Sequence, residues 1–83
     1  MTDIESCIRD FIREEILFRR RSVVLTADTE LGNGLMDSLG MARLISFLEQ
    51  EFDIEIERAD LVPANFSTVR DIEALISRKV ESA

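Results

Sequence analysis

The segment from Gly34 to Gly40, with the sequence GLMDSLG, is the part of the chain whose residue types could do chemistry. It places the hydroxyl of Ser38 directly after a glycine-containing loop and at the predicted first turn of a helix. N–H groups at a helix start lack intrahelical acceptors and the helix dipole is positive there, so a phosphate ester on Ser38 would be stabilised. Serine is also common at helix starts without any further role, and these residues alone favour that plain capping role.

Other catalytic and metal-binding arrangements are excluded by the residue inventory. The chain has no histidine and a single cysteine, Cys7, so it has neither an imidazole base nor a usual zinc site. No phosphate-binding glycine loop followed by lysine is present. Asp53, Glu55 and Glu57 alternate as in a calcium loop, but the central glycine and distal glutamate of an EF-hand are missing. We therefore expect a solvated acidic edge here and no enzymatic activity.

Three amphipathic segments are predicted to form the long helices that position Ser38. Apolar residues recur at helical spacing over residues 2–20, over residues 38–52 and after Thr68. Thr68 is followed three residues later by Asp71, which is a capping-box pattern. The predicted apolar stripe of the second helix consists of Leu39, Ala42, Leu44, Ile45, Leu48 and Phe52.

The segments between these helices carry turn and loop residues. Residues 22–37 are predicted to form a long loop, held to the core by Leu25, Leu31 and Leu35. Residues 53–57 are predicted to be an extended connector, and Pro63 limits residues 58–66 to a short helix. The predicted fold is therefore all-α. It is a single domain over residues 1–83, a four-helix bundle with three long helices, one short helix and a long first loop.

The composition limits the partners and the compartment. The net charge is −7, and all of it comes from residues 23–83. Such an acidic surface repels phosphate backbones, so we expect no nucleic-acid binding and a preference for basic partner surfaces. There is no apolar run of membrane-spanning length and no secretion signal at the N-terminus. A monomeric cytoplasmic protein with no membrane association is predicted, and its lone Cys7 is expected to be a small buried apolar residue.

Several stretches of the chain resemble the carrier-protein family of fatty-acid, polyketide and peptide biosynthesis. They are Asp37-Ser38-Leu39 at the head of a helix, Leu44, and the run FLEQEFDIEI over residues 47–56. The later run DLVPANFSTV, residues 60–69, is similar to the segment that joins the third and fourth helices of stand-alone carriers. The resemblance covers about residues 31–80.

This resemblance implies a carrier that catalyses nothing itself. Ser38 would bear a covalently attached 4′-phosphopantetheine arm, added by a phosphopantetheinyl transferase, with Asp37 helping to hold magnesium during the transfer. The arm would carry acyl or aminoacyl intermediates as thioesters between loading enzymes and downstream biosynthetic enzymes. By the same analogy, the residues that would dock partner enzymes are Leu39, Arg43, Glu49, Glu51, Glu55 and Glu57.

Two residues depart from the pattern of fatty-acid carriers. Arg43 occupies a position on the exposed helix face where those carriers usually place an acid, and Gly40 lies in the first turn at a cost of roughly 1 kcal/mol relative to alanine. We therefore predict a specialised pathway that makes a polyketide, a nonribosomal peptide or a modified amino acid. The alternatives are the carrier of primary fatty-acid synthesis and a carrier-like helical module that binds a partner without being modified.

Overall fold

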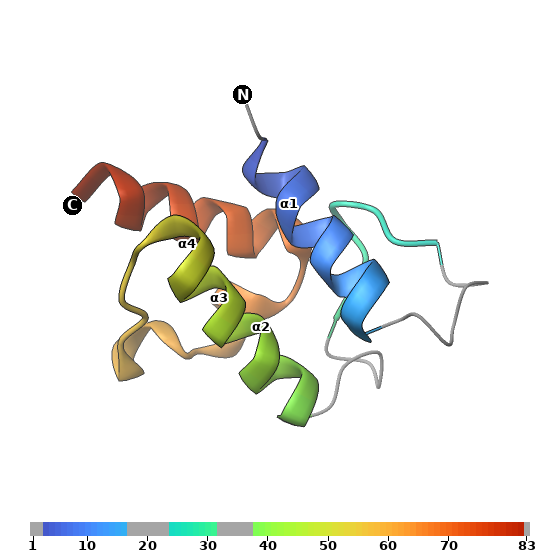
Figure 1. The fold of residues 1–83 in the computed structure, drawn as a ribbon, viewed down its shortest axis with the longest axis horizontal. Helices are drawn as coiled ribbons and strands as arrows, with labels where there is room; N and C mark the ends of the chain where they lie inside the picture. Colours follow the sequence, from blue (N-terminus) through green and yellow to red (C-terminus); the bar gives the residue numbers. More distant parts are fainter. Residues whose placement is uncertain (1–2, 17–23, 32–37, 83) are drawn as a thin grey trace.

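The computed structural model describes residues 3–16, 24–31 and 38–82, and within these ranges the chain is helical with no strand (Figure 1). The elements are α1 (Ile4–Phe11), the π-helical turn η1 (Ile12–Ile16), α2 (Ser38–Phe52), the 3₁₀ turn η2 (Arg58–Asp60), α3 (Pro63–Phe66) and α4 (Val69–Ser82). The predicted all-α fold with three long helices and one short helix is confirmed. No helix among the described residues is long and apolar enough to cross a membrane.

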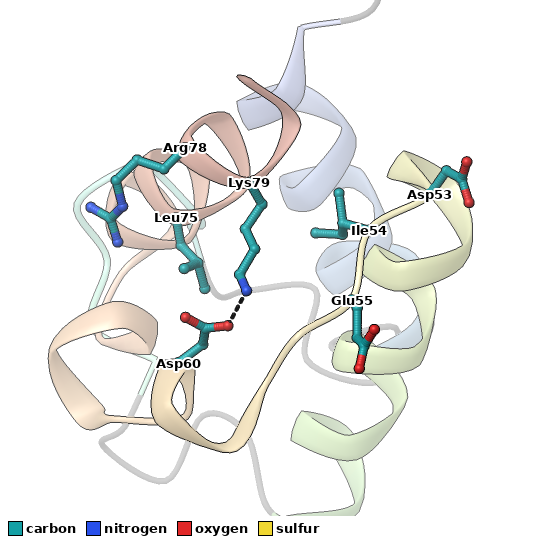
Figure 2. Close-up of a pocket in the computed structure, with 7 residues that line it drawn as sticks. All are labelled: Asp53, Ile54, Glu55, Asp60, Leu75, Arg78 and Lys79. Carbon is teal, nitrogen blue, oxygen red and sulfur yellow. Dashed lines mark ion pairs between the residues drawn. The ribbon is translucent and has the colours of Figure 1, made fainter. Parts of the chain in front are cut away.

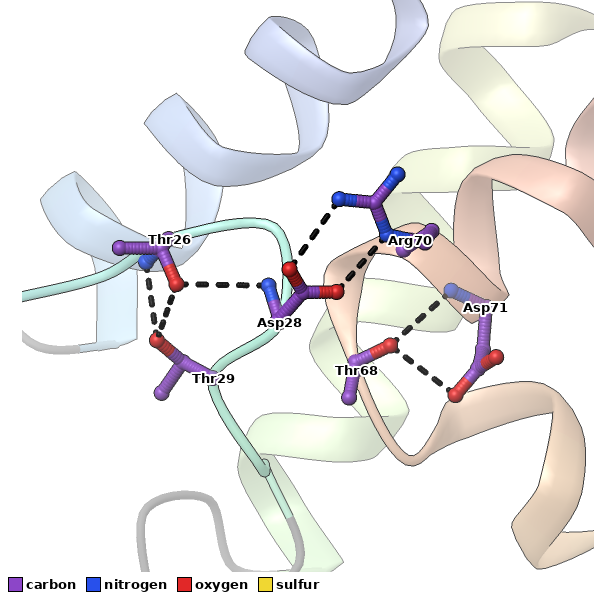
Figure 3. Close-up of polar contacts among 6 residues, drawn as sticks. All are labelled: Thr26, Asp28, Thr29, Thr68, Arg70 and Asp71. Atoms are coloured by element: carbon purple, nitrogen blue, oxygen red, sulfur yellow. Dashed lines mark hydrogen bonds and ion pairs between the residues drawn. The ribbon is translucent and has the colours of Figure 1, made fainter.

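The helix boundaries agree with the sequence where local signals are strong. Helix α2 has the predicted bounds, and α3 starts at Pro63, where a proline costs no intrahelical hydrogen bond. Thr68 caps α4 as predicted: its Oγ1 accepts a 3.1 Å hydrogen bond from the Asp71 N–H and donates one of 2.9 Å to the Asp71 carboxylate (Figure 3). The first helix was predicted to be α-helical throughout, but its winding widens to a π-turn after Phe11. The rest of that predicted helix, residues 17–20, lies outside the described residues.

The core is built from the inner faces of α1, α2 and α4, together with α3 and the first loop. Its buried members are Ile8, Ile12, Leu25, Leu31, Leu44, Leu48, Phe66, Val69, Ile72, Leu75 and Ile76. The prediction that Leu39 and Ala42 belong to the apolar stripe of α2 is wrong, because both are exposed. At 100° per residue Leu39 lies about 140° around the helix from the buried Leu44, and Ala42 about 160°.

Helices α1 and α2 run antiparallel, and their contacts fix the register. The rings of Phe11 and Phe47 stack with centroids 4.2 Å apart and an angle of 16° between their planes. Four residues further along the first helical segment and four residues back along α2, Glu15 pairs with Arg43 at 3.1 Å. Residue numbers thus increase along one helix while those of their contact partners decrease along the other, as expected for two antiparallel helices. Phe47 is half-buried at this contact.

The first loop is fastened to the start of α4 through its backbone. Leu25 and Leu31 are buried, as predicted, whereas Leu35 lies outside the described residues. The Leu31 N–H donates to the Ser67 carbonyl at 2.8 Å, and the Arg70 N–H donates to the Ala27 carbonyl at 2.9 Å. These bonds satisfy backbone groups that a loop on the core would otherwise bury without partners.

Side chains strengthen the same attachment (Figure 3). The Arg70 guanidinium forms a bidentate pair with the Asp28 carboxylate, at 2.7 and 3.1 Å. This hydrogen bond and the charge of Arg70 lower the pKa of Asp28 below its usual value. Within the loop, Thr29 Oγ1 accepts a hydrogen bond from the Thr26 N–H at 2.9 Å. The described part of the loop, residues 24–31, is therefore an ordered turn held against α4.

Candidate functional site

The start of helix α2 places Ser38 as the sequence predicted. Ser38 is the first residue of this 15-residue helix, and its first turn contains no acidic residue. An incoming phosphate would therefore meet the positive end of the helix dipole with no negative side chain in that turn. Asp37, the predicted magnesium-binding residue, lies outside the described residues. The arrangement fits a covalently attached phosphodiester.

The surface of α2 next to Ser38 is partly apolar, and the exposed Arg43 lies on it one helical turn after Leu39. Leu39 is 70% exposed, so most of its side chain lies outside the core. Ala42, Ser46 and Gln50 are also exposed on this face, and none of them is charged. Gly40, by contrast, is buried, so a side chain at that position would have to fit into the packed interior. This packing gives a reason for the helix-weakening glycine.

Arg43, a predicted docking residue, is engaged within the molecule. Its guanidinium donates to the Glu15 carboxylate at 3.1 Å and to the Glu15 carbonyl at 3.3 Å. About half of each side chain is exposed. The positive charge that distinguishes this chain from fatty-acid carriers is thus locally balanced, and Arg43 also links α2 to the end of the first helical segment.

We expect Arg43→Gln to lower the free energy of unfolding by no more than about 1 kcal/mol, because exposed ion pairs contribute little. Urea unfolding of Arg43→Gln, Glu15→Gln and the double variant would measure the coupling between the two side chains. A coupling of several kcal/mol would contradict the exposed position of this pair.

Glu49 closes the end of α2, although the sequence placed it on the docking surface. Its carbonyl accepts the Ile54 N–H at 3.2 Å, and its carboxylate accepts the Ile56 N–H at 2.9 Å. Asp53, the residue after the last residue of α2, has φ = 53°, in the left-handed region. With the bond from the Ile54 N–H to the Glu49 carbonyl, this conformation ends the helix in a Schellman-type turn. The half-buried Glu49 side chain therefore has a structural function that its position in the sequence does not reveal.

The other predicted docking acids lie beyond or beside the exposed face of α2. Glu55 and Glu57 are exposed on the extended connector, where they alternate with the partly buried Ile54 and Ile56. Glu51 is exposed on the side of α2 that faces α1, where it lines a hollow with Cys7. The acids are thus divided between two sides of the molecule and do not form one continuous patch with Leu39.

Asp60 organises the hollow between the connector and α4 (Figure 2). Its carboxylate forms an ion pair with Lys79 and accepts the Glu57 N–H at 2.9 Å. Its carbonyl accepts a hydrogen bond from the Asn65 side chain at 2.9 Å. No local spacing in the sequence links Asp60 to Lys79 on α4, so the sequence alone does not reveal this group. The hollow lies at the far end of α2 from Ser38, about 20 Å along the helix.

The pKa of Asp60 is lowered, first by the hydrogen bond from Lys79 and then by the bond from the Glu57 backbone. Because this pKa is lower in the folded than in the unfolded chain, the carboxylate stabilises the fold above about pH 3.9 and loses that effect as the pH falls through the folded pKa. We expect Asp60→Asn to be less stable than wild type at pH 7 and to lose less stability than wild type between about pH 4 and pH 2. The measurement is the free energy of unfolding in urea, determined for both proteins at a series of pH values. If the two free energies fell by the same amount over this pH range, the result would contradict this ion pair.

Cys7 is only partly exposed, and burial is the largest cause of its raised pKa, followed by the negative charges of Glu51 and Asp10. This environment disfavours the reactive thiolate. Among the described residues, no group of three or more His, Cys, Asp or Glu side chains is placed to hold a metal ion. Asp53, Glu55 and Glu57 belong to this described part of the chain.

Comparisons with known proteins point to the same segment. A family model described as a phosphopantetheine attachment site matches residues 17–76, which include Ser38 and all of α2. A probable acyl carrier protein, PigG, from Serratia sp. (strain ATCC 39006) is 39% identical over 44 residues. That alignment covers 53% of this chain and 51% of the relative, so the chain spans about half the length of the curated protein it matches.

Proposed function

Because the chain belongs to the phosphopantetheine attachment family, whose members carry 4′-phosphopantetheine covalently, we propose that Ser38 is the attachment residue and that the chain delivers thioester-bound intermediates. The observation that supports Ser38 most strongly is its place as the first residue of α2, inside the matched segment and beside the exposed Leu39. The chain would act as a carrier and not as an enzyme.

Attachment is a displacement at phosphorus. The Ser38 hydroxyl attacks the β-phosphate of coenzyme A, an O–P bond forms, and the bond to the departing 3′,5′-ADP breaks. The hydroxyl proton passes to a base of the phosphopantetheinyl transferase. Asp37 would help to hold the magnesium ion that balances the phosphate charge. The positive end of the α2 dipole favours the phosphodiester that results.

When attached, the arm supplies a terminal thiol that holds the cargo as a thioester. We propose an acyl or aminoacyl cargo, and the similarity to a probable acyl carrier protein supports the acyl choice. The exposed Leu39, together with Arg43 in place of an acid on the same face of α2, favours a specialised pathway over primary fatty-acid synthesis.

The test is to incubate the purified chain with coenzyme A, magnesium and a broad-specificity phosphopantetheinyl transferase, and then to measure its intact mass. A gain of one phosphopantetheine is expected. If the chain gains nothing under conditions that fully load a control carrier, it is not a carrier but an unmodified interaction module.

A further inference from the structure

A hollow of about 430 Å³ lies beside α2 on the side of α1, and attachment of the arm does not involve it. Its aromatic part consists of Phe11 and Phe47, whose half-buried rings stack with centroids 4.2 Å apart. The other lining residues, all exposed on α2, are Ala42, Arg43, Ser46 and Gln50. Among the described residues no carboxylate lines this hollow. We call it the Phe11–Phe47 hollow, and its size is in the range of sites that hold small organic groups.

The hollow lies along the same helical row as the proposed attachment residue. Counted in steps of four from Ser38, the next residues of this row are Ala42, Ser46 and Gln50. Each step advances about 6 Å along the helix and turns about 40° around it, towards the side of Phe47. The row therefore enters the hollow one turn after Ser38 and reaches the level of Ser46 after about 12 Å.

The 4′-phosphopantetheine arm has the length needed to reach the two rings. Between its phosphate and its sulfur it has as many chain atoms as a segment of about four residues, which gives an extended length of about 14 Å. Laid along the row, the arm therefore ends between the levels of Ser46 and Gln50. Phe47 lies at that level, so a cargo on the terminal thiol would meet the stacked rings.

The chemistry of the hollow favours a flat aromatic cargo. A third ring gains stacked or edge-to-face contacts on the two phenylalanines that an aliphatic group of the same size does not. The guanidinium of Arg43 adds a cation, which is attracted to the face of an aromatic ring. It has five N–H donors, of which the bonds to Glu15 use two. Three of the six lining residues are polar, so a long alkyl chain would remain largely in water here.

We propose that the Phe11–Phe47 hollow binds the cargo end of the arm on Ser38 and prefers an aromatic acyl group, such as benzoyl, to an aliphatic one. The inference rests on the proposed function, because a loaded arm is what brings a cargo to this place. The exposed Ser46 hydroxyl and Gln50 amide would donate hydrogen bonds to carbonyl oxygens of the arm and of the thioester. A thioester held in this way is partly shielded from nucleophiles in solution until a partner enzyme withdraws the arm.

The test uses the full chain, labelled with ¹³C and ¹⁵N and loaded by the transferase from benzoyl coenzyme A. Its matched aliphatic cargo is loaded from cyclohexanecarbonyl coenzyme A. We expect nuclear Overhauser contacts from the benzoyl protons to the rings of Phe11 and Phe47. Compared with the same thioester on free pantetheine, cleavage by hydroxylamine should be about two- to tenfold slower for protein-bound benzoyl and less slowed for the aliphatic cargo.

The variant Phe47→Leu removes the ring but keeps an apolar side chain, so it should lose this protection. The matched control is Phe52→Leu, since Phe52 is also partly buried on α2 but does not line the hollow. Overhauser contacts centred on α4 or on residues 53–57, equal protection of the two cargoes, or equal losses in the two variants would overturn the proposal. The contacts are measured in wild type, so they do not depend on the folding of Phe47→Leu.

The mass gain on loading separates this inference from the proposed function. A chain that gains no acylated arm while a control carrier is loaded contradicts both. A chain that is fully loaded but shows no contact between the benzoyl group and the two rings contradicts the Phe11–Phe47 hollow alone.

Discussion

Replacing Leu48 with alanine is expected to lower the free energy of unfolding by about 2–5 kcal/mol. Leu48 is fully buried in the core that α2 forms with the other helices, so its truncation removes apolar contacts and leaves a cavity. A domain of this size has a total stability on the order of 4–12 kcal/mol, so the loss would be a large part of the whole. Urea unfolding followed by circular dichroism measures it.

The matched control is Leu39→Ala on the same helix. Leu39 is 70% exposed, so the same change of residue should alter the free energy of unfolding by no more than about 0.5 kcal/mol. Phe52 is only partly buried, so Phe52→Ala should lower the free energy of unfolding by less than Leu48→Ala does. Equal urea midpoints for Leu48→Ala and Leu39→Ala would show that α2 presents a different face to the core.

The sequence predicted the elements whose signals are local. The bounds of α2, the Thr68 cap of α4 and the short helix at Pro63 follow from residues that lie within a turn or two of one another. The connector at residues 53–57 was predicted to be extended because its alternating residues have no second strand to pair with, and its isoleucines do pack against the core. Such features depend on capping and periodicity, which a single sequence displays directly.

The sequence could not predict contacts between distant segments. Asp28 and Arg70 pair across 42 positions, and no spacing in the chain points to that pair. The same holds for the ion pair between Asp60 and Lys79. The antiparallel register of α1 and α2 depends on how the two helices pack and not on either helix alone.

The candidate site shows the same division. Ser38 could be placed because it lies at a helix start, where its neighbours in sequence are also its neighbours in space. The docking surface was harder, because an acidic side chain near the end of a helix can serve a partner or its own chain. Glu49 illustrates this, since its carboxylate binds the Ile56 N–H. Exposure separates Leu39 from the core residues that share its hydrophobicity.

Ser38→Ala is expected to abolish attachment of the arm completely, because no other hydroxyl would then be presented at the start of α2. Ser46→Ala is the matched control, since Ser46 is exposed on the same helix two turns further on. Alanine has the highest helix propensity, so both proteins should remain folded.

The decisive measurement is the intact mass of wild type, Ser38→Ala and Ser46→Ala after incubation with coenzyme A, magnesium and the transferase. We predict a gain of one phosphopantetheine in wild type and Ser46→Ala and no gain in Ser38→Ala. A full gain in Ser38→Ala, or no gain in wild type while a control carrier is loaded, would contradict the assignment of Ser38 as the attachment residue.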